Sequence, residues 1–190
     1  MFEGPFKEGE EQSTTLEEIN GVVTPRSLQM LVQWVCLGRV VSGEYAPDVA
    51  VTTAIEFAKL ADMCRITGME PLMAEHIKAI ILTNPAPEDW KWDDGRAPDT
   101  NARCLTSQHI TSAVALPEGH PVRAILAAAT VEGCLRLHNY KFEREASSVP
   151  EFSVDLLKAV RATLESISIE YNVTTFEDPI SRMRLRLKMA

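Results

Sequence analysis

Residues 47–82 read PDVAVTTAIEFAKLADMCRITGMEPLMAEHIKAIIL, and this stretch decides the predicted fold. Small and apolar side chains recur in it every three to four residues, which is the spacing of one helical face. The first face consists of Ala50, Ala54, Phe57, Ala58 and Ala61. The second consists of Met69, Leu72, Met73, His76, Ile77, Ile80 and Ile81. The stretch predicts two consecutive helices, over residues 48–63 and 69–82, with Thr67 and Glu70 as a capping box for the second.

A third helix is predicted before this stretch, over residues 25–37. Thr24 is a suitable N-cap, Pro25 occupies the first helical position and Gly38 provides a stop signal. The apolar face of this helix consists of Leu28, Leu31, Val32 and Val35. We expect one small core to form from Leu28, Leu31, Val32, Phe57, Ile77 and Ile80.

A second helical block is predicted after a polar, proline-containing linker over residues 85–106 that includes Trp90 and Trp92. Its helices cover residues 107–115, 121–137 and 150–168, and the last begins with a Ser148–Glu151 capping pattern. The block spans residues 107–170, and residues 171–190 form a tail whose end alternates apolar and basic side chains. That alternation suits an edge strand, an anionic partner or a frayed end. The predicted class is mainly α, with at most one or two short strands.

Composition narrows the functional class. The chain has 190 residues, 45% of them hydrophobic, and a net charge of −8, which disfavours a nucleic-acid-binding protein. The four cysteines lie far apart without zinc-site spacing, and Cys36 and Cys64 fall in apolar patterns, so we expect buried free thiols in a reducing compartment. The N-terminal residues lack the features of a signal peptide, and the apolar runs are too short to span a bilayer. We therefore expect an intracellular protein of the cytoplasm or nucleus.

No catalytic pattern appears in the sequence. His76, His109, His120 and His138 belong to no metal-binding motif, and there is no glycine-rich phosphate loop or nucleophile elbow. We predict no catalytic, cofactor-binding or metal-binding residues and no enzymatic activity. The alternative is a small helical enzyme or ligand-binding protein with a site between the two helical blocks. Such a site would bring His109, His120 or His138 together with acids.

The order of these segments resembles the second half of a fungal BTB/POZ domain. Residues 4–12, GPFKEGEEQ, look like the loop after the second helix of that family. Residues 28–38 look like its next helix, although they end in VCLG where the family usually has Leu-Tyr-Thr-Gly. Residues 56–63, EFAKLADM, resemble the family's apolar helix that ends in Leu-Ala-Asp, and residues 68–72, GMEPL, resemble the turn and last helix. Residues 105–165 look like the helical extension behind such domains.

The resemblance implies a partial BTB/POZ-like domain over residues 1–84, without the family's first half. A gene-model error, a fragment and a natural short form would each account for this. The implied function is a non-catalytic protein–protein interaction scaffold or adaptor, including the role of substrate adaptor for a cullin-type ubiquitin ligase. The implied partner is a cullin-type scaffold or another BTB/POZ chain, with no nucleic acid and no membrane. The expected interaction surface consists of Phe6, Leu28, Leu31, Trp34 and Phe57.

Overall fold

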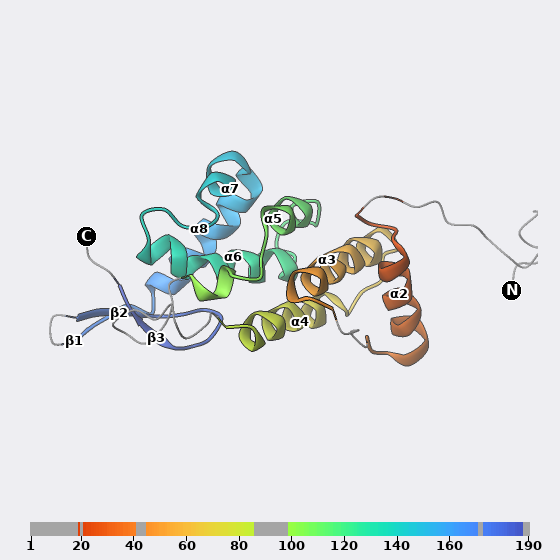
Figure 1. Ribbon diagram of the computed structural model, residues 1–190, viewed down its shortest axis with the longest axis horizontal. Coiled ribbons are helices and arrows are strands. Elements are labelled where there is room, and N and C mark those ends of the chain that lie inside the picture. The colour runs from red at the N-terminus through yellow and green to blue at the C-terminus, as the bar shows by residue number, and fades with distance from the viewer. Residues whose placement is uncertain (1–18, 20, 41–44, 86–98, 171–172, 188–190) are drawn as a thin grey trace, which may run out of the picture.

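The computed structural model describes residues 19, 21–40, 45–85, 99–170 and 173–187 (Figure 1). Within them, seven α-helices dominate and a small antiparallel sheet follows, which confirms the mainly α class. The helices are α2 (Pro25–Leu37), α3 (Pro47–Met63), α4 (Glu70–Thr83), α5 (Ser107–Ala113), α6 (Pro121–Arg136), α7 (Glu143–Ser148) and α8 (Pro150–Leu164), with a 3-10 segment, η2 (Thr100–Ala102), before α5. Figure 1 places α2 at one end of the molecule and the sheet at the other.

Local capping explains where α2 begins and ends. The Thr24 hydroxyl accepts a hydrogen bond from the Ser27 amide at 3.1 Å, and the Ser27 hydroxyl accepts one from the Thr24 amide at 2.9 Å. Gly38 ends the helix in the left-handed region, at φ 64°, and its amide donates to the Trp34 carbonyl. Both predicted ends of this helix are confirmed.

The other two predicted capping boxes do not form. Helix α4 starts after Met69, and the Glu70 carboxylate instead accepts from the Gly68 amide at 2.7 Å. Residues 143–148, which carry no long periodic pattern, form the short helix α7, so that Val149 precedes α8 as its N-cap. The start of α8 at Pro150 is nevertheless as predicted, because proline suits the first helical position.

The sheet is the main departure from the predicted secondary structure. It contains β1 (Ser168–Glu170), β2 (Val173–Glu177) and β3 (Arg184–Arg186) in the order β1-β2-β3, one strand more than expected. Helix α8 ends at Leu164, earlier than the predicted residue 168, and just beyond this end the Ser166 hydroxyl donates to the Thr163 carbonyl at 2.6 Å. The alternating segment near the C-terminus forms the edge strand β3, with Leu185 buried and its two arginines exposed.

One hydrophobic core runs through both helical blocks. Phe57 and Ile77 of the first block and Leu126 and Phe152 of the second belong to the same buried cluster. Residues Ala102 and Leu105, at the end of the predicted linker, are also buried in it, so this part of the linker is packed rather than free. Trp90 and Trp92 lie outside the described residues.

Helix α2 is rotated by about one residue, or about 100°, from the predicted orientation. Its inner face presents the buried Ser27 and Met30 and the half-buried Leu31 and Trp34. Val32, expected in the core, is 60% exposed, so that expectation is wrong. A hydrogen bond of 2.8 Å from the Thr24 hydroxyl to Glu56 of α3, which no sequence pattern reveals, helps to fix this orientation.

Two cysteines also differ from expectation. Cys36 and Cys64 were predicted to be buried, but both are exposed. Cys36 lies four residues after Val32 and shares the outward side of α2 with it. Cys64 is the C-cap of α3, where the helix has already left the core. The four cysteines, all within the described residues, are free thiols.

Candidate functional site

Only part of the predicted interaction surface is accessible to a partner in the structure. Leu28, Leu31 and Trp34 lie half-buried on α2, and Phe6 lies outside the described residues. Phe57 has no exposed area, because α3 presents it to the core between α2 and α4, and it cannot contact a partner in this fold. The assignment of Phe57 to the surface is therefore wrong.

An apolar stripe nevertheless covers the outer side of α2. The outer stripe, as we call it, consists of Leu28, Val32 and Val35, at spacings of four and three residues, and Val32 and Val35 are 60% and 69% exposed. Leu37, next to the end of the helix, is exposed as well. The sequence contained a signal for this stripe, because apolar residues of α2 occupy more positions than one inward face can hold.

The surroundings of the outer stripe are sparse and basic. Helix α2 packs mainly on α3, and no other described element makes comparable contact with it. Residues 25–40 contain no acidic side chain, whereas Arg26 and Arg39 stand at either end of the helix. Arg26 lies over the Tyr45 ring, 5.6 Å from its centre. The outer stripe thus lies on a helix without acidic side chains, with Arg26 in its first turn and Arg39 just beyond its end.

The three histidines of the alternative hypothesis do not come together. His109 is buried and fully engaged, since its Nδ1 accepts from the Thr106 amide at 3.1 Å and its Nε2 lies 2.8 Å from the Thr52 hydroxyl. His138 is exposed. His120 lines a pocket away from both, and this pocket also contains acidic residues. One of the three histidines, His120, thus shares a pocket with acids, although this pocket does not lie between the two helical blocks.

Acid is expected to destabilise the protein through its buried histidines, with His109 as the test case. Burial lowers the pKa of His109. The nearby Asp48 raises this pKa and Lys141 lowers it further, so that the pKa of the folded protein lies below its usual value. In the unfolded chain the ring titrates near its usual pKa of about 6.5. As the pH falls below that value, the unfolded state binds more protons than the folded state, so stability present at higher pH is progressively lost.

Urea unfolding checks this prediction. We expect the midpoint to fall between pH values of about 7 and about 5, and to fall less in His109→Gln, which keeps a capping side chain at the third helical position. An identical pH dependence of the two proteins would contradict a contribution from His109.

The pocket beside His120 has a volume of about 560 Å³ and lies between α6, α8 and the turn over residues 177–182. Its apolar wall consists of Ala124 and Ala128 of α6 and Ala159 and Ala162 of α8. Charged side chains also line it, and these are Asp155, Lys158, Glu165, Glu177 and Arg182. A concave site of this size, with an apolar wall and a few polar groups, suits a small molecule.

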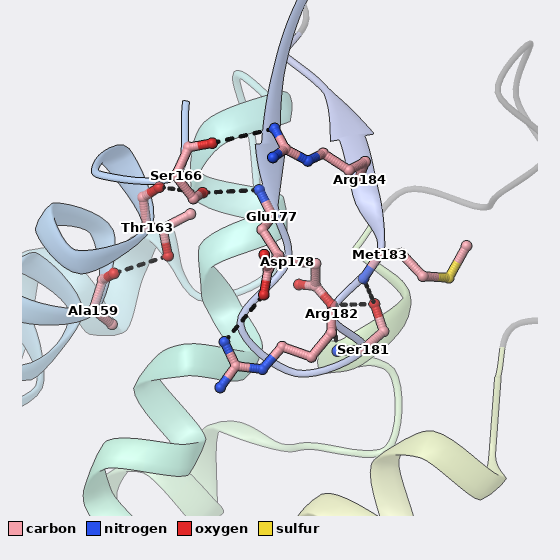
Figure 2. A network of polar contacts seen from close by, with 9 residues as sticks. All are labelled: Ala159, Thr163, Ser166, Glu177, Asp178, Ser181, Arg182, Met183 and Arg184. Carbon is pink, nitrogen blue, oxygen red and sulfur yellow. Dashed lines mark hydrogen bonds and ion pairs between the residues drawn. The ribbon is translucent and has the colours of Figure 1, made fainter. Parts of the chain in front are cut away.

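Hydrogen bonds hold the outer wall of the pocket in place, as Figure 2 shows. The Ser166 hydroxyl accepts from the Glu177 amide at 2.9 Å, which joins the end of α8 to β2. The Arg184 guanidinium of β3 donates to the Ser166 carbonyl at 3.4 Å. At the turn, Arg182 pairs with Glu177 at 3.2 Å, while the buried Asp178 accepts from the Ser181 amide at 2.7 Å. The sheet therefore builds a wall that the helices alone would lack.

The partly buried thiols are poor nucleophiles. Burial raises the pKa of Cys104 and the pKa of Cys134, which keeps both protonated at neutral pH. Burial is also the main reason why the pKa of Tyr140, a hydrogen-bonding neighbour of Cys134, rises to about 12. Among the residues that the structure describes, no three metal-ligating side chains gather closely enough to hold a metal ion.

Comparison with known proteins adds no assignment. No protein-family model matches the chain, and no match was found among curated proteins or among solved structures. In the described part of the chain, no helix combines the length and the apolar character that crossing a membrane requires.

Proposed function

We propose that the chain is a non-catalytic protein-interaction module that docks its partner on the outer stripe of α2. The observation that carries this proposal is the exposure of Val32 and Val35 on a helix that already has a separate inner face against α3. Apolar side chains that recur along one outward helix face are typical of a surface that another protein covers.

The partner that fits this surface presents an amphipathic helix of its own. The thirteen residues of α2 extend over about 20 Å, long enough to pair lengthwise with about three turns of a second helix. An apolar stripe on the partner would cover Val32 and Val35, and an acidic residue beyond the end of that stripe would meet Arg39. Charge complementarity thus favours an acidic, apolar-striped helix over a basic one.

The BTB/POZ resemblance adds candidates to this proposal. Under it, the partner is another BTB/POZ chain or a cullin-type scaffold, and the chain acts as a scaffold or substrate adaptor. The four free thiols support a location in the cytoplasm or nucleus, where thiols stay reduced.

Site-specific crosslinking followed by direct binding measurements tests the docking surface. A photoreactive benzoylphenylalanine at the position of Val35 should capture a partner in cells, and the same group at Leu157, exposed on α8, should not. The captured protein, purified, should bind the unmodified chain in calorimetry. The captured protein should bind the Val32→Glu/Val35→Glu variant at least about tenfold more weakly than the unmodified chain, because the two charges would then face its apolar stripe.

Val154→Glu/Leu157→Glu is the matched control, since it adds the same two charges to exposed apolar positions of α8. Equal loss of affinity in the two double variants would contradict a specific role of α2. Self-association of the chain through α2, seen by light scattering and removed by Val32→Glu/Val35→Glu, would replace the proposed heterologous partner with a second copy.

A further inference from the structure

The small sheet has a free edge at β3. Among the described residues, the strand order β1-β2-β3 leaves β3 paired with β2 on one side only. The Leu187 amide donates to the Thr174 carbonyl at 2.9 Å, so the backbone groups of Leu187 point to β2. In an antiparallel ladder this direction alternates along the strand, so the amides and carbonyls of Arg184 and Arg186 point away from β2. A further strand can form hydrogen bonds with them.

The side chains of the two arginines lie together on the outer face of the sheet. Arg186 is opposite Thr175 in the register, and Thr175 is opposite Ser168. These residues and Arg184 line a shallow hollow of about 470 Å³. Leu185, between the arginines, faces the other way and is buried, whereas both arginines are exposed. The free edge and the arginine side chains are therefore accessible from the same side.

Neither arginine is neutralised by the residues that it contacts. The Arg184 guanidinium donates to the Ser168 hydroxyl at 2.6 Å and to the Ser166 carbonyl at 3.4 Å, and Figure 2 shows the second of these bonds. Both acceptors are uncharged. The Arg186 side chain forms no hydrogen bond or ion pair with any residue that the structure describes. Its charge is thus open to an external anion.

Two carboxylates near this face do not cancel its positive charge. Glu177 is opposite Arg184 in the register but pairs with Arg182 at 3.2 Å. Glu170 lies on β1, two strand spacings or about 10 Å from β3. Three arginines and two glutamates leave this part of the sheet with a net charge of +1, in a chain whose net charge is −8. The face is therefore a local exception to the acidic character of the chain.

An extended acidic segment would satisfy the edge and the charge together. In antiparallel pairing with β3, two of its residues would lie opposite Arg184 and Arg186, with Cβ atoms about 5 Å apart. Because alternate residues share a face, those two positions are separated by one residue. Carboxylates at both would meet the two guanidinium groups. The arginines would repel a basic strand, and charged edges hinder pairing with other strands, so the edge selects an acidic one.

We propose that the edge of β3 binds an extended segment of a partner protein as an added antiparallel strand, with the pattern acid, any residue, acid set against Arg184 and Arg186. Nucleic acid shares the negative charge but has no backbone amides and carbonyls to match the strand edge. The site lies at the opposite end of the molecule from α2 (Figure 1) and does not depend on the docking proposed there.

Fluorescence anisotropy of the full chain with the labelled peptide Thr-Val-Glu-Val-Glu-Val-Thr tests the proposal, and saturable binding is expected. N-methylation of both glutamates, whose amides would face β3, should abolish binding, whereas N-methylation of the valine between them should leave it unchanged. The peptide with lysine in place of both glutamates should bind at least about tenfold more weakly. No saturation up to about 1 mM acidic peptide would overturn the proposal, as would equal effects of the two methylations or tighter binding of the lysine peptide or of single-stranded oligothymidylate.

Variants assign the binding to the two arginines. Arg184→Gln/Arg186→Gln should weaken binding of the acidic peptide at least about fivefold, while Arg144→Gln/Arg161→Gln, which removes the same charge from exposed positions of α7 and α8, should not. Arg186→Gln alone loses no bond to a described residue, so it cannot act through misfolding, and should weaken binding by about threefold. Unchanged binding in Arg186→Gln would overturn the proposal, and so would equal loss in the two double variants.

Discussion

Phe57→Ala is expected to lower the free energy of unfolding by about 3–5 kcal/mol, which is a large part of the net stability of a domain. Phe57 is among the largest side chains with no exposed area, and it lies in the cluster that α3 shares with α4 and α6. Removing its ring takes away the burial of apolar surface and leaves a cavity that the surrounding helices can close only in part.

Urea unfolding monitored by circular dichroism measures this effect. Leu157→Ala is the control, since Leu157 is 68% exposed and its truncation should change the free energy of unfolding by less than about 0.5 kcal/mol. A similar small change in Phe57→Ala would mean that Phe57 is not a core residue. Because Phe57 was also assigned to the interaction surface, the same measurement decides between its two predicted roles.

The helices were predictable from the sequence because their signals are local. Thr24, Pro25 and Gly38 are three such signals around α2, and each acts within a few residues of the helix end it marks. The Thr67–Glu70 pattern has the right spacing, but the helix starts after Met69 and the Glu70 side chain bonds to Gly68 instead. Short patterns therefore predicted where helices lie more reliably than how each end is capped.

The orientation of α2 and the presence of the sheet depend on contacts between distant segments. The bond between Thr24 and Glu56 joins residues 32 positions apart, so the periodicity of α2 alone could not select its inner face. Strands β1 and β3 have three residues each, too few for an alternating pattern to stand out. Ser166, whose hydroxyl joins the end of α8 to β2, has no sequence signature of this role.

The same reason explains why the pocket was missed. Its residues extend from Gly119 to Arg182, and they come together only after α8 and the sheet have folded back on α6. His120 was one of the histidines considered for a site, but its place beside these residues is a property of the folded chain. The surface proposed for docking lies on the same helix as most of the predicted interaction residues, and the two sets share Leu28.

The second large effect is expected at a buried ion pair that joins α6 to α8. The Arg123 Nε donates to Asp155 at 2.8 Å, and its side chain also donates to the Leu116 carbonyl at 3.0 Å. The side chains of Arg123 and Asp155 are only 6% and 9% exposed. Arg123→Met would leave the Asp155 carboxylate buried without its counter-charge, and we expect a loss of about 3–5 kcal/mol in the free energy of unfolding.

Two further variants show whether burial is the cause of this loss. Lys158→Met breaks a pair of similar length, 2.7 Å, between α8 and Glu118, but its two side chains are 58% and 74% exposed. Solvent screens such a pair, so the loss of stability should be much smaller than in Arg123→Met. Arg123→Met/Asp155→Leu removes both buried charges and should recover most of the stability lost in Arg123→Met, since no uncompensated carboxylate remains. If the double variant were as unstable as Arg123→Met, the main contribution of Arg123 would be its bond to the Leu116 carbonyl and its packing, rather than its charge.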